Sequence, residues 1–456
     1  MPTPSLHIRR AALCAAAAAA SAVAAAAHPA AAQSAAQPAP ALRALTLAEA
    51  LDLAARNAPA VVRAEGQVRA GQAAVRAARG AFLPNLALTA STTEQSPATA
   101  RLNPATGELV AGRWATNGGI AASVTVFDAF QRQFDLRAAR AQETAAGAGV
   151  LQQRASVGLQ VKQQFFAALA ADEALVAARV QRAQADTQLA LTRVRVLART
   201  ATVADSLQAR IQVAQAEVAE ITAVNDRRVA DAALGRLVGL LTPVTARGDA
   251  AGLPTADAEA PLGVDSAALV ALAGEAPQVR QSGAALAAAR AGVRAARAPY
   301  FPTLAVNYAR NGLGSSSAFN PLPPNFRYSG QLRFSVNVPV FDQFNRQQAL
   351  AQAQVAEASA DADARDARLA AAQTVAAQLA ALGTARAQAA AQRVAITAGE
   401  EALRVQRQRY RLGVATVLDV LTAQTQLAQA RFQLAQARFA ARTARAQLEA
   451  LAGRDL

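Results

Sequence analysis

The side chains that most often carry out chemistry in proteins are almost absent from this chain. Its one cysteine is Cys14, and its two histidines are His7 and His28. All three lie within residues 1–32, which have the pattern of a secretory signal peptide. The mature chain would therefore have no thiolate nucleophile and no imidazole base or metal ligand. No nucleophile-elbow motif, phosphate-binding loop or clustered acidic metal motif occurs, so we expect no enzyme, no cofactor and no metal site.

Two aspartates remain as candidates for a charged site. Asp419 follows Thr416 by three residues, and Asp205 follows Thr202 by three residues. This is the spacing of a capping box, in which the carboxylate supports the first turn of a helix. If several chains met around one axis, the same carboxylates would form close acidic rings that could select cations or pair with arginine. Both interpretations stay open at this stage.

The stretch from Tyr410 to Ala430 organises the rest of the chain. Gly413 suits the left-handed residue that ends one helix, and the Thr416–Asp419 pair begins the next. Apolar or small residues then recur at steps of three and four, which is typical of a coiled coil. These residues are Val420, Ala423, Leu427, Ala430, Leu434, Ala437, Ala441, Ala444, Leu448 and Leu451. Because the seam is rich in alanine, the helices are expected to approach closely.

The chain is internally duplicated. Phe127-Asp128 recurs as Phe341-Asp342 and Asp205 recurs as Asp419, both 214 residues later. Residues 82–86 (FLPNL) recur as residues 300–304 (YFPTL). A period above 200 residues indicates two copies of one structural unit rather than a solenoid.

The tip motif Y-x-L-G-x-x-T-x-x-D-V-L, the long Ala/Gln/Leu helix after it, the duplication and the P-x-L strand openings resemble the TolC family of outer-membrane channel proteins. The resemblance covers roughly residues 45–453. It implies a homotrimer in which a long coiled-coil α-helical barrel continues into a 12-stranded β-barrel, with four strands from each chain. It also implies a location in the outer membrane, extending into the periplasm.

Residues 1–32 are predicted as the signal because Arg9 and Arg10 precede an alanine-rich run and Ala30–Ala32 supplies a cleavage site. The run is too short for a transmembrane anchor. Lipidation at Cys14 would require a small residue where Leu13 stands.

The domain organisation follows the duplication. An N-terminal linker at 33–44 leads to a first repeat at 45–241, an inter-repeat linker at 242–264 and a second repeat at 265–456. The first repeat is predicted to hold a β-hairpin at 85–127 and long helices at 129–197 and 203–240. The second is predicted to hold a hairpin at 303–341 and long helices at 343–411 and 416–452. The longest helices would span roughly 100 Å.

The strand before the last long helices has the clearest alternation. Leu332, Phe334, Val336 and Val338 alternate with Gln331, Arg333, Ser335 and Asn337. An apolar outer face and a polar inner face at period two are typical of a strand in contact with lipid. In residues 119–127, Ile120, Ala122, Val124 and Val126 are expected on one face. Four strands cannot close into a barrel, so we expect several chains to share it.

The resemblance also implies two sites. At the periplasmic gate we place Asp419, Asp205, Tyr410 and Arg199. At the tip that docks a periplasmic adaptor we place Leu412, Gly413, Val414, Ala415, Thr416, Thr200, Ala201 and Thr202. Arg199 stands where the first turn would have glycine. Ala415 and Thr422 replace a family arginine and a second aspartate, so Arg193, Arg199 or Arg411 would supply the pairing cation.

The net charge of +15 does not indicate a nucleic-acid partner. Lys162 is the only lysine, and the arginines recur singly along helices, with only 4% aromatic residues in the chain. Solvated helix faces explain this pattern.

Three functions fit. The first is the outer-membrane exit duct of a tripartite efflux pump, working with an adaptor and an inner-membrane pump on small toxic compounds. The second is the same duct in type I protein secretion. The third is a periplasmic coiled-coil scaffold without a pore, which leaves the two alternating hairpins unexplained.

Overall fold

A computed structural model describes residues 43–102, 107, 109–240, 242, 244–248, 265–321, 323 and 326–453. The predicted signal peptide and most of both predicted linkers lie outside the described residues. Each predicted linker nevertheless contains residues of a short strand. Strand β1 (Arg43–Leu45) pairs in parallel with β4 (Val244–Ala246), which joins the start of one repeat to the segment after it. Strands of three residues are too short to give a periodic signal, so the sequence did not indicate them.

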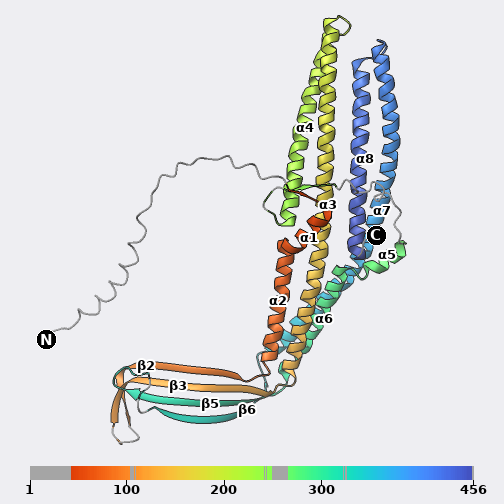
Figure 1. The fold of residues 1–456 in the computed structure, drawn as a ribbon. Helices are drawn as coiled ribbons and strands as arrows, with labels where there is room; N and C mark the ends of the chain where they lie inside the picture. The colour runs from red at the N-terminus through yellow and green to blue at the C-terminus, as the bar shows by residue number, and fades with distance from the viewer. Residues whose placement is uncertain are drawn as a thin grey trace, which may run out of the picture. The chain divides into compact units, whose positions relative to one another are not determined.

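Apart from two short strands and one 3₁₀ turn, the two repeats contain the same elements in the same order (Figure 1). The first comprises α1 (Leu47–Asn57), α2 (Pro59–Gly80), β2 (Asn85–Leu102), β3 (Leu109–Phe127), α3 (Gln131–Leu197) and α4 (Val203–Val238). The second comprises α5 (Ser266–Ala273), α6 (Pro277–Arg297), the 3₁₀ turn η1 (Ala298–Tyr300), β5 (Thr303–Ser316), β6 (Arg327–Asn337), α7 (Asn345–Arg411) and α8 (Val417–Ala452). Helices α3 and α7 have 67 residues each, and α4 and α8 have 36 each. The two helical hairpins, α3–α4 and α7–α8, therefore have equal helix lengths.

The strands form one antiparallel sheet in the order β2-β3-β5-β6, so each repeat contributes one hairpin (Figure 1). Val306 lies opposite Val124 on one side and Phe334 on the other, and Asn307 lies opposite Ser123 and Arg333. Successive side chains of a strand point to opposite faces, so the register sorts the sheet into one apolar and one polar face. The apolar face, called the apolar band below, consists of Leu86, Leu88, Ile120, Ala122, Val124, Leu304, Val306, Tyr308, Leu332, Phe334 and Val336.

The alternation predicted for β3 changes at its end. A bulge lies between Thr125 and Phe127, and Phe127 rather than Val126 is opposite Leu304. A bulge adds one residue to one strand and bends it. Phe127 therefore continues the apolar band up to the start of α3.

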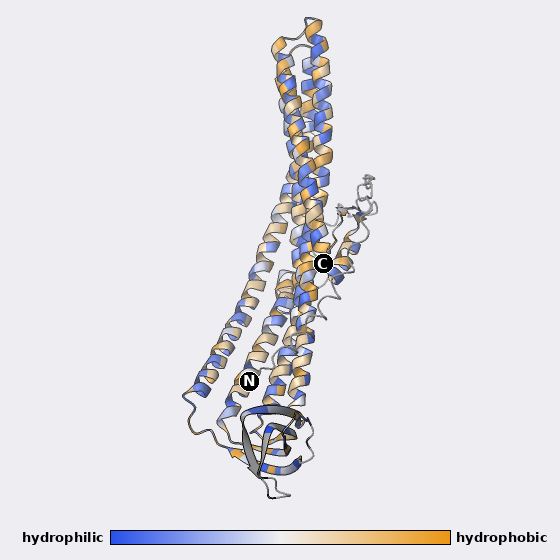
Figure 2. Ribbon diagram, turned by 90° about the vertical axis from the view of Figure 1, so that its left-hand side faces the viewer, coloured by the Kyte–Doolittle hydropathy of each residue, from blue (hydrophilic) through white to orange (hydrophobic). Residues whose placement is uncertain are grey.

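The long helices pack in pairs, α3 with α4 and α7 with α8. Eight of the ten predicted seam residues of α8 are buried, and Leu434 and Leu451 are partly buried. Figure 2 shows hydrophobic and hydrophilic residues interspersed along these helices, as expected where each buries only a narrow stripe. Among the described residues, no helix is long and apolar enough to cross a membrane.

The short helices cover the middle of the long ones. Helix α1 packs on α3 and α4, and α5 packs on α7 and α8. The first core joins Phe165, Leu234 and Val238 to Phe439 of α8, so it connects the two repeats. The second surrounds Val375, Leu382 and Leu448. Val161 and Val375, 214 residues apart, are both almost fully buried, so the duplicated sequence buries equivalent positions.

Both long hairpins turn with the same backbone. Gly413 has φ +76°, and Arg199, at the equivalent position, has φ +57°. The amide of Thr200 donates to the carbonyl of Arg195, and the amide of Val414 donates to that of Arg409, which is the closing bond of a Schellman motif. The turn therefore keeps its backbone conformation although arginine replaces glycine at position 199. The left-handed conformation is less favourable for a residue with a Cβ, so Arg199 is expected to lower the stability of its turn.

Replacing Arg199 by glycine is expected to raise the free energy of unfolding by about 1 kcal/mol, because glycine adopts positive φ without steric cost. The matched variant is Gly413→Ala, whose new Cβ would meet no atom within 4 Å. It should lower the free energy of unfolding by a similar amount through backbone strain alone. Thermal unfolding of the full chain in detergent, followed by circular dichroism, would measure both. An unchanged midpoint for Gly413→Ala would contradict this explanation.

Candidate functional site

The two aspartates at the helix starts are held by their capping threonines. The Thr416 amide and hydroxyl donate to Asp419 Oδ2, both at 2.8 Å, and the Asp419 amide donates back to Thr416 Oγ1 at 3.3 Å. The corresponding distances for Thr202 and Asp205 are 3.0, 2.9 and 3.2 Å. Both predicted capping boxes are thus present in full.

Capping also fixes the charge of Asp419. The hydrogen bond from the Thr416 amide, followed by that from its hydroxyl, lowers the pKa of Asp419, and the positive charge of Arg409 acts in the same direction. The side chain is therefore ionised at neutral pH and exposed to solvent. A carboxylate of this kind can support its helix and present a negative charge at the same time, so the two interpretations are compatible.

Tyr410 connects the two long hairpins near their turns. The guanidinium carbon of Arg195 in α3 lies 4.4 Å from the centre of the Tyr410 ring in α7, a cation–π contact. Tyr410 itself packs against the small core formed by Leu403, Val420, Ala423 and Leu427. The contact brings the end of α3 to the end of α7, and with them the turns that follow.

Arg195 is a residue that the sequence did not single out. The sequence instead offered Arg193, Arg199 or Arg411 as cations that could pair with the gate aspartates, and that pairing stays a prediction. The cation that faces Tyr410 is decided by the rotation of α3 about its own axis, which no motif encodes. Arg411 instead lines the groove between the hairpins, and Arg199 lies exposed in its turn.

The predicted docking residues form two exposed turns. Leu412 is 71% exposed and Val414 is 64% exposed, although both are large and apolar. Gly413, Thr416, Thr200 and Thr202 are also exposed, whereas Ala415 and Ala201 are half-buried. The centre of the second turn is therefore apolar and that of the first is polar, because Arg199 and Thr200 replace Gly413 and Val414. The first turn is nevertheless flanked by the apolar Leu197 and Val203, which are 84% and 66% exposed.

A long groove of about 1760 Å³ separates the two helical hairpins. Alanines and glutamines from α3, α4, α7 and α8 line most of it, and Arg404, Arg407, Arg411 and Arg431 add positive charge. Small apolar side chains let the helices approach, and the amides and guanidinium groups keep the groove hydrated. In the part of the chain that the structure describes, no group of three or more His, Cys, Asp or Glu could hold a metal ion.

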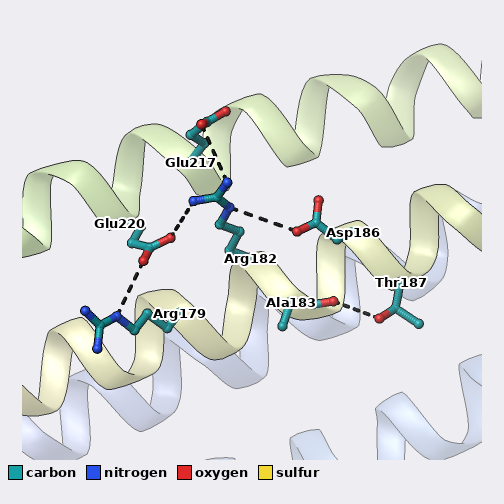
Figure 3. Close-up of polar contacts among 7 residues, drawn as sticks. All are labelled: Arg179, Arg182, Ala183, Asp186, Thr187, Glu217 and Glu220. Carbon is teal, nitrogen blue, oxygen red and sulfur yellow. Dashed lines mark hydrogen bonds and ion pairs between the residues drawn. The ribbon is translucent and has the colours of Figure 1, made fainter.

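An ion-pair network connects α3 and α4 (Figure 3). Arg182 lies among Glu220, Glu217 and Asp186, at 2.9, 3.6 and 4.0 Å, and Arg179 lies 3.4 Å from Glu220. The hydrogen bond from Arg182 lowers the pKa of Glu220. Because exposed ion pairs contribute little singly, the shared Arg182 matters mainly for alignment of the two helices.

The second repeat reaches the same alignment with different residues. Arg431 donates to Glu400 at 2.6 Å, and these positions correspond to Glu217 and Asp186. The first repeat has acidic residues at both positions and places Arg182 between them. The second has a direct pair, and Ile396 of the small core occupies the position of Arg182.

The only lysine joins the two repeats. Lys162 Nζ in α3 lies 2.7 Å from Glu449 Oε2 in α8, and the two side chains are 20% and 15% exposed. Arg445 also contacts Glu449, at 3.4 Å. A partly buried pair with two cations is screened less than a surface pair, so it strengthens the contact between α3 and α8.

Comparison with known proteins agrees with this architecture. Residues 50–240 and 268–454 match the family described as Outer membrane efflux protein, which is one segment in each repeat. The chain is 30% identical over 431 residues to Protein CyaE of Bordetella pertussis, covering 91% of this chain and 85% of that protein.

Two solved structures have the same fold. A membrane protein from Pseudomonas aeruginosa gives a TM-score of 0.73 at 21% identity, over 90% of each chain. The MtrE outer membrane channel of Neisseria gonorrhoeae, solved in its open state, gives 0.70 at 22% identity, over 90% of this chain and 89% of that one. The predicted fold and the resemblance to the TolC family are confirmed. The chain therefore belongs to the outer membrane efflux protein family and is a protein of the outer membrane that extends into the periplasm.

Proposed function

We propose that three copies of this chain form a channel that serves as the outer-membrane exit duct of a tripartite efflux pump for small toxic compounds. The observation that carries this proposal is the sheet. Its four strands end in β2 on one side and β6 on the other, and neither edge has a partner strand in the described part of the chain. In lipid, unpaired backbone groups cost several kcal/mol each, so the edges must pair.

Pairing between chains satisfies both edges. The β6 edge of one chain would meet the β2 edge of the next, and three chains would give a barrel of twelve strands. A closed membrane barrel requires eight or more strands, which one chain cannot supply. The number three comes from the family.

The two faces of the sheet suit the two surfaces of such a barrel. In the apolar band, Leu88, Phe334 and Val336 are 84%, 68% and 69% exposed, so these large side chains lack a covering layer in one chain. Lipid would cover them. The opposite face carries Asn85, Ser123, Asn307 and Arg333 in one row across the four strands, which suits a hydrated lumen.

The helical hairpins would continue the lumen through the periplasm to the tip. There the exposed Leu412 and Val414 offer an apolar surface to a periplasmic adaptor protein, which would connect the channel to an inner-membrane pump. The first turn would present Arg199 and Thr200 between the exposed Leu197 and Val203, so its docking surface would differ from that of the second turn. Asp419 and Asp205 would repeat around the threefold axis near the narrow end, close to the Arg195–Tyr410 contact.

The face of β6 provides one test. Val336→Arg puts a charge on the apolar band and is expected to cost about 2–4 kcal/mol in the bilayer. Ser335→Arg, one residue away, points to the polar face and should be tolerated. The yield of heat-sensitive oligomer in outer-membrane fractions would measure both. Equal yields of the two variants would reject either the facing or the membrane assignment.

The acidic residues provide a second test, on single channels in planar bilayers. Asp419→Asn combined with Asp205→Asn removes two charges from every chain but leaves side chains that can still bond to the capping threonines. Conductance is expected to change and cation preference to fall. Thr416→Ala is the matched control, because it removes the cap and keeps the charge. It should lower stability by about 1 kcal/mol without altering selectivity.

The outcomes separate the alternatives. Unchanged selectivity in the double aspartate variant, with oligomers intact, would leave the aspartates with capping alone. Absence of any channel activity in the unmodified protein would favour the scaffold without a pore. Normal drug sensitivity of a deletion strain, together with loss of a secreted polypeptide, would replace efflux by type I secretion.

A further inference from the structure

A pocket of about 550 Å³ lies between α3 and α4, close to the end of α4. Its lining includes three arginines and three large apolar side chains, those of Leu175, Val224 and Leu240. The volume and the apolar walls are typical of sites for small molecules, which combine apolar surface with a few polar groups. The proposed function gives this pocket, called the α4 pocket below, no role.

Two of the three arginines in the lining are already neutralised. Arg179 lies 3.4 Å from Glu220 Oε1, and Arg227 lies 3.2 Å from Asp172 Oδ1. Arg228 is exposed and has no acidic partner among the described residues. It is therefore the cation that the α4 pocket offers to an anionic group.

The one acidic residue of the lining is also engaged. Asp231 is 7% exposed, and its Oδ2 accepts a hydrogen bond from Thr245 Oγ1 at 3.3 Å. Arg227 Nε lies 3.7 Å from the same oxygen. Asp231 therefore belongs to the contact between α4 and β4 and leaves the charge of Arg228 uncompensated.

The duplication indicates how this surface of α4 is covered. Each residue of α4 corresponds to the residue of α8 that lies 214 positions later. Ala446 of α8 is 3% exposed because it shares the first core with Phe166 of α3. Its equivalent in the α4 pocket, Ala232, is exposed. A helix equivalent to α3 would have to cover Ala232 as α3 covers Ala446.

That helix would be α7 of a second copy. The equivalent of α3 in the duplication is α7, which packs on α5, α6 and α8 within its own chain. In the proposed assembly around one axis, α4 of one copy would lie beside α7 of the next, as α8 lies beside α3 within the chain. Adding 214 to the positions of α3 that face α8 then gives the positions of α7 that face the α4 pocket.

These positions of α7 carry much smaller side chains than those of α3. The residues of α3 that pack toward α8 include Lys162, Phe166 and Leu169. Their equivalents in α7 are Ala376, Ala380 and Gly383, all of which are exposed in one chain. A Cβ on Gly383 would meet no atom within 4 Å. A helix with these residues covers the pocket without filling it, so a cavity remains between the two copies.

The place and the chemistry of this cavity limit its ligand. Helix α4 ends at Val238, about midway along α3 and away from the sheet (Figure 1). A molecule dissolved in the periplasm could reach this place, whereas a phospholipid held in the bilayer could not. Apolar walls with one free guanidinium group suit an amphiphile with a carboxylate, because a guanidinium group binds a carboxylate through two parallel hydrogen bonds.

We propose that the α4 pocket binds a fatty acid at the junction between two copies of the chain. The acyl chain lies along Leu175, Val224 and Leu240, beneath the segment 376–383 of the second copy, and the carboxylate bonds to Arg228. The bound molecule adds apolar contact between the copies and so stabilises the oligomer. This inference rests on the proposed assembly, because a second copy completes the site.

Photo-cross-linking tests the site on the full-length protein assembled in phosphatidylcholine nanodiscs. The probe is a palmitic acid analogue with a diazirine in its acyl chain, and the cross-linked peptides are identified by mass spectrometry. We expect labelled peptides from both α4 and α7. Palmitate should compete with the probe, whereas methyl palmitate, which lacks the charged carboxylate, should not.

Three variants test the two halves of the site. Arg228→Gln should weaken labelling about tenfold, the effect of losing one charge-assisted hydrogen bond. Arg210→Gln is the matched control, because Arg210 is an exposed arginine of α4 outside the pocket lining, and it should label normally. Gly383→Leu gives α7 the side chain that Leu169 has in α3 and should abolish labelling by filling the cavity. If Gly383→Leu yields no heat-sensitive oligomer, Arg228→Gln decides.

The outcomes separate this inference from the proposed function. If the oligomer conducts in planar bilayers but methyl palmitate competes as well as palmitate, or Arg228→Gln labels normally, the fatty-acid site is rejected and the channel stands. Labelling of α4 without α7 would reject the junction between copies. Competition by phosphatidylglycerol but not by palmitate would replace the fatty acid by a membrane lipid. If the unmodified protein neither assembles nor conducts, the channel is rejected and the site with it.

Discussion

The pairing of backbone groups at the two edges of a four-stranded sheet is the constraint on which the rest of the structure depends. In water, β2 and β6 could leave their outer N–H and C=O groups to solvent, but in lipid they cannot. The apolar band makes water an unfavourable environment for the same sheet, since its largest side chains lie exposed in one chain. In the proposed assembly, copies of the chain around one axis would pair these two edges with each other.

The junctions between the sheet and the long helices determine how each helix continues from its strand. Each strand that enters a long helix passes through two left-handed residues and an Asp–Arg clamp, which fixes the direction in which the helix leaves. Alanine seams then let α3 pack closely on α4 and α7 on α8. Ion pairs also link the helices of each long pair, through Arg182 in the first repeat and the Glu400–Arg431 pair in the second. Lys162 and Glu449 join the two repeats between α3 and α8.

Duplication preserves geometry more strictly than it preserves residues. Arg199 adopts the conformation of Gly413, and both helices after the turns begin with the same capping box. What differs is the surface. The second turn exposes Leu412 and Val414, whereas the first exposes Arg199 and Thr200 between the apolar Leu197 and Val203. The cation–π contact between Arg195 and Tyr410 connects the two hairpins. The two turns therefore share one backbone but present different side chains, so the proposed docking surface differs between them.

The sequence by itself determined the features that depend on local periodicity and on short-range hydrogen bonds. The period-two alternation around Val336, the seam of α8, the helix start at Thr416 and Asp419 and the family resemblance of the tip all follow from residues close together in the chain. Tertiary structure alone decided the pairing of β1 with β4, the bulge that brings Phe127 opposite Leu304, and the choice of Arg195 as the cation on Tyr410. The physical reason is that these contacts join residues distant in sequence. Which residues meet depends on the rotation of each long helix about its axis and on the register of each strand. Neither can be read from a short stretch of sequence.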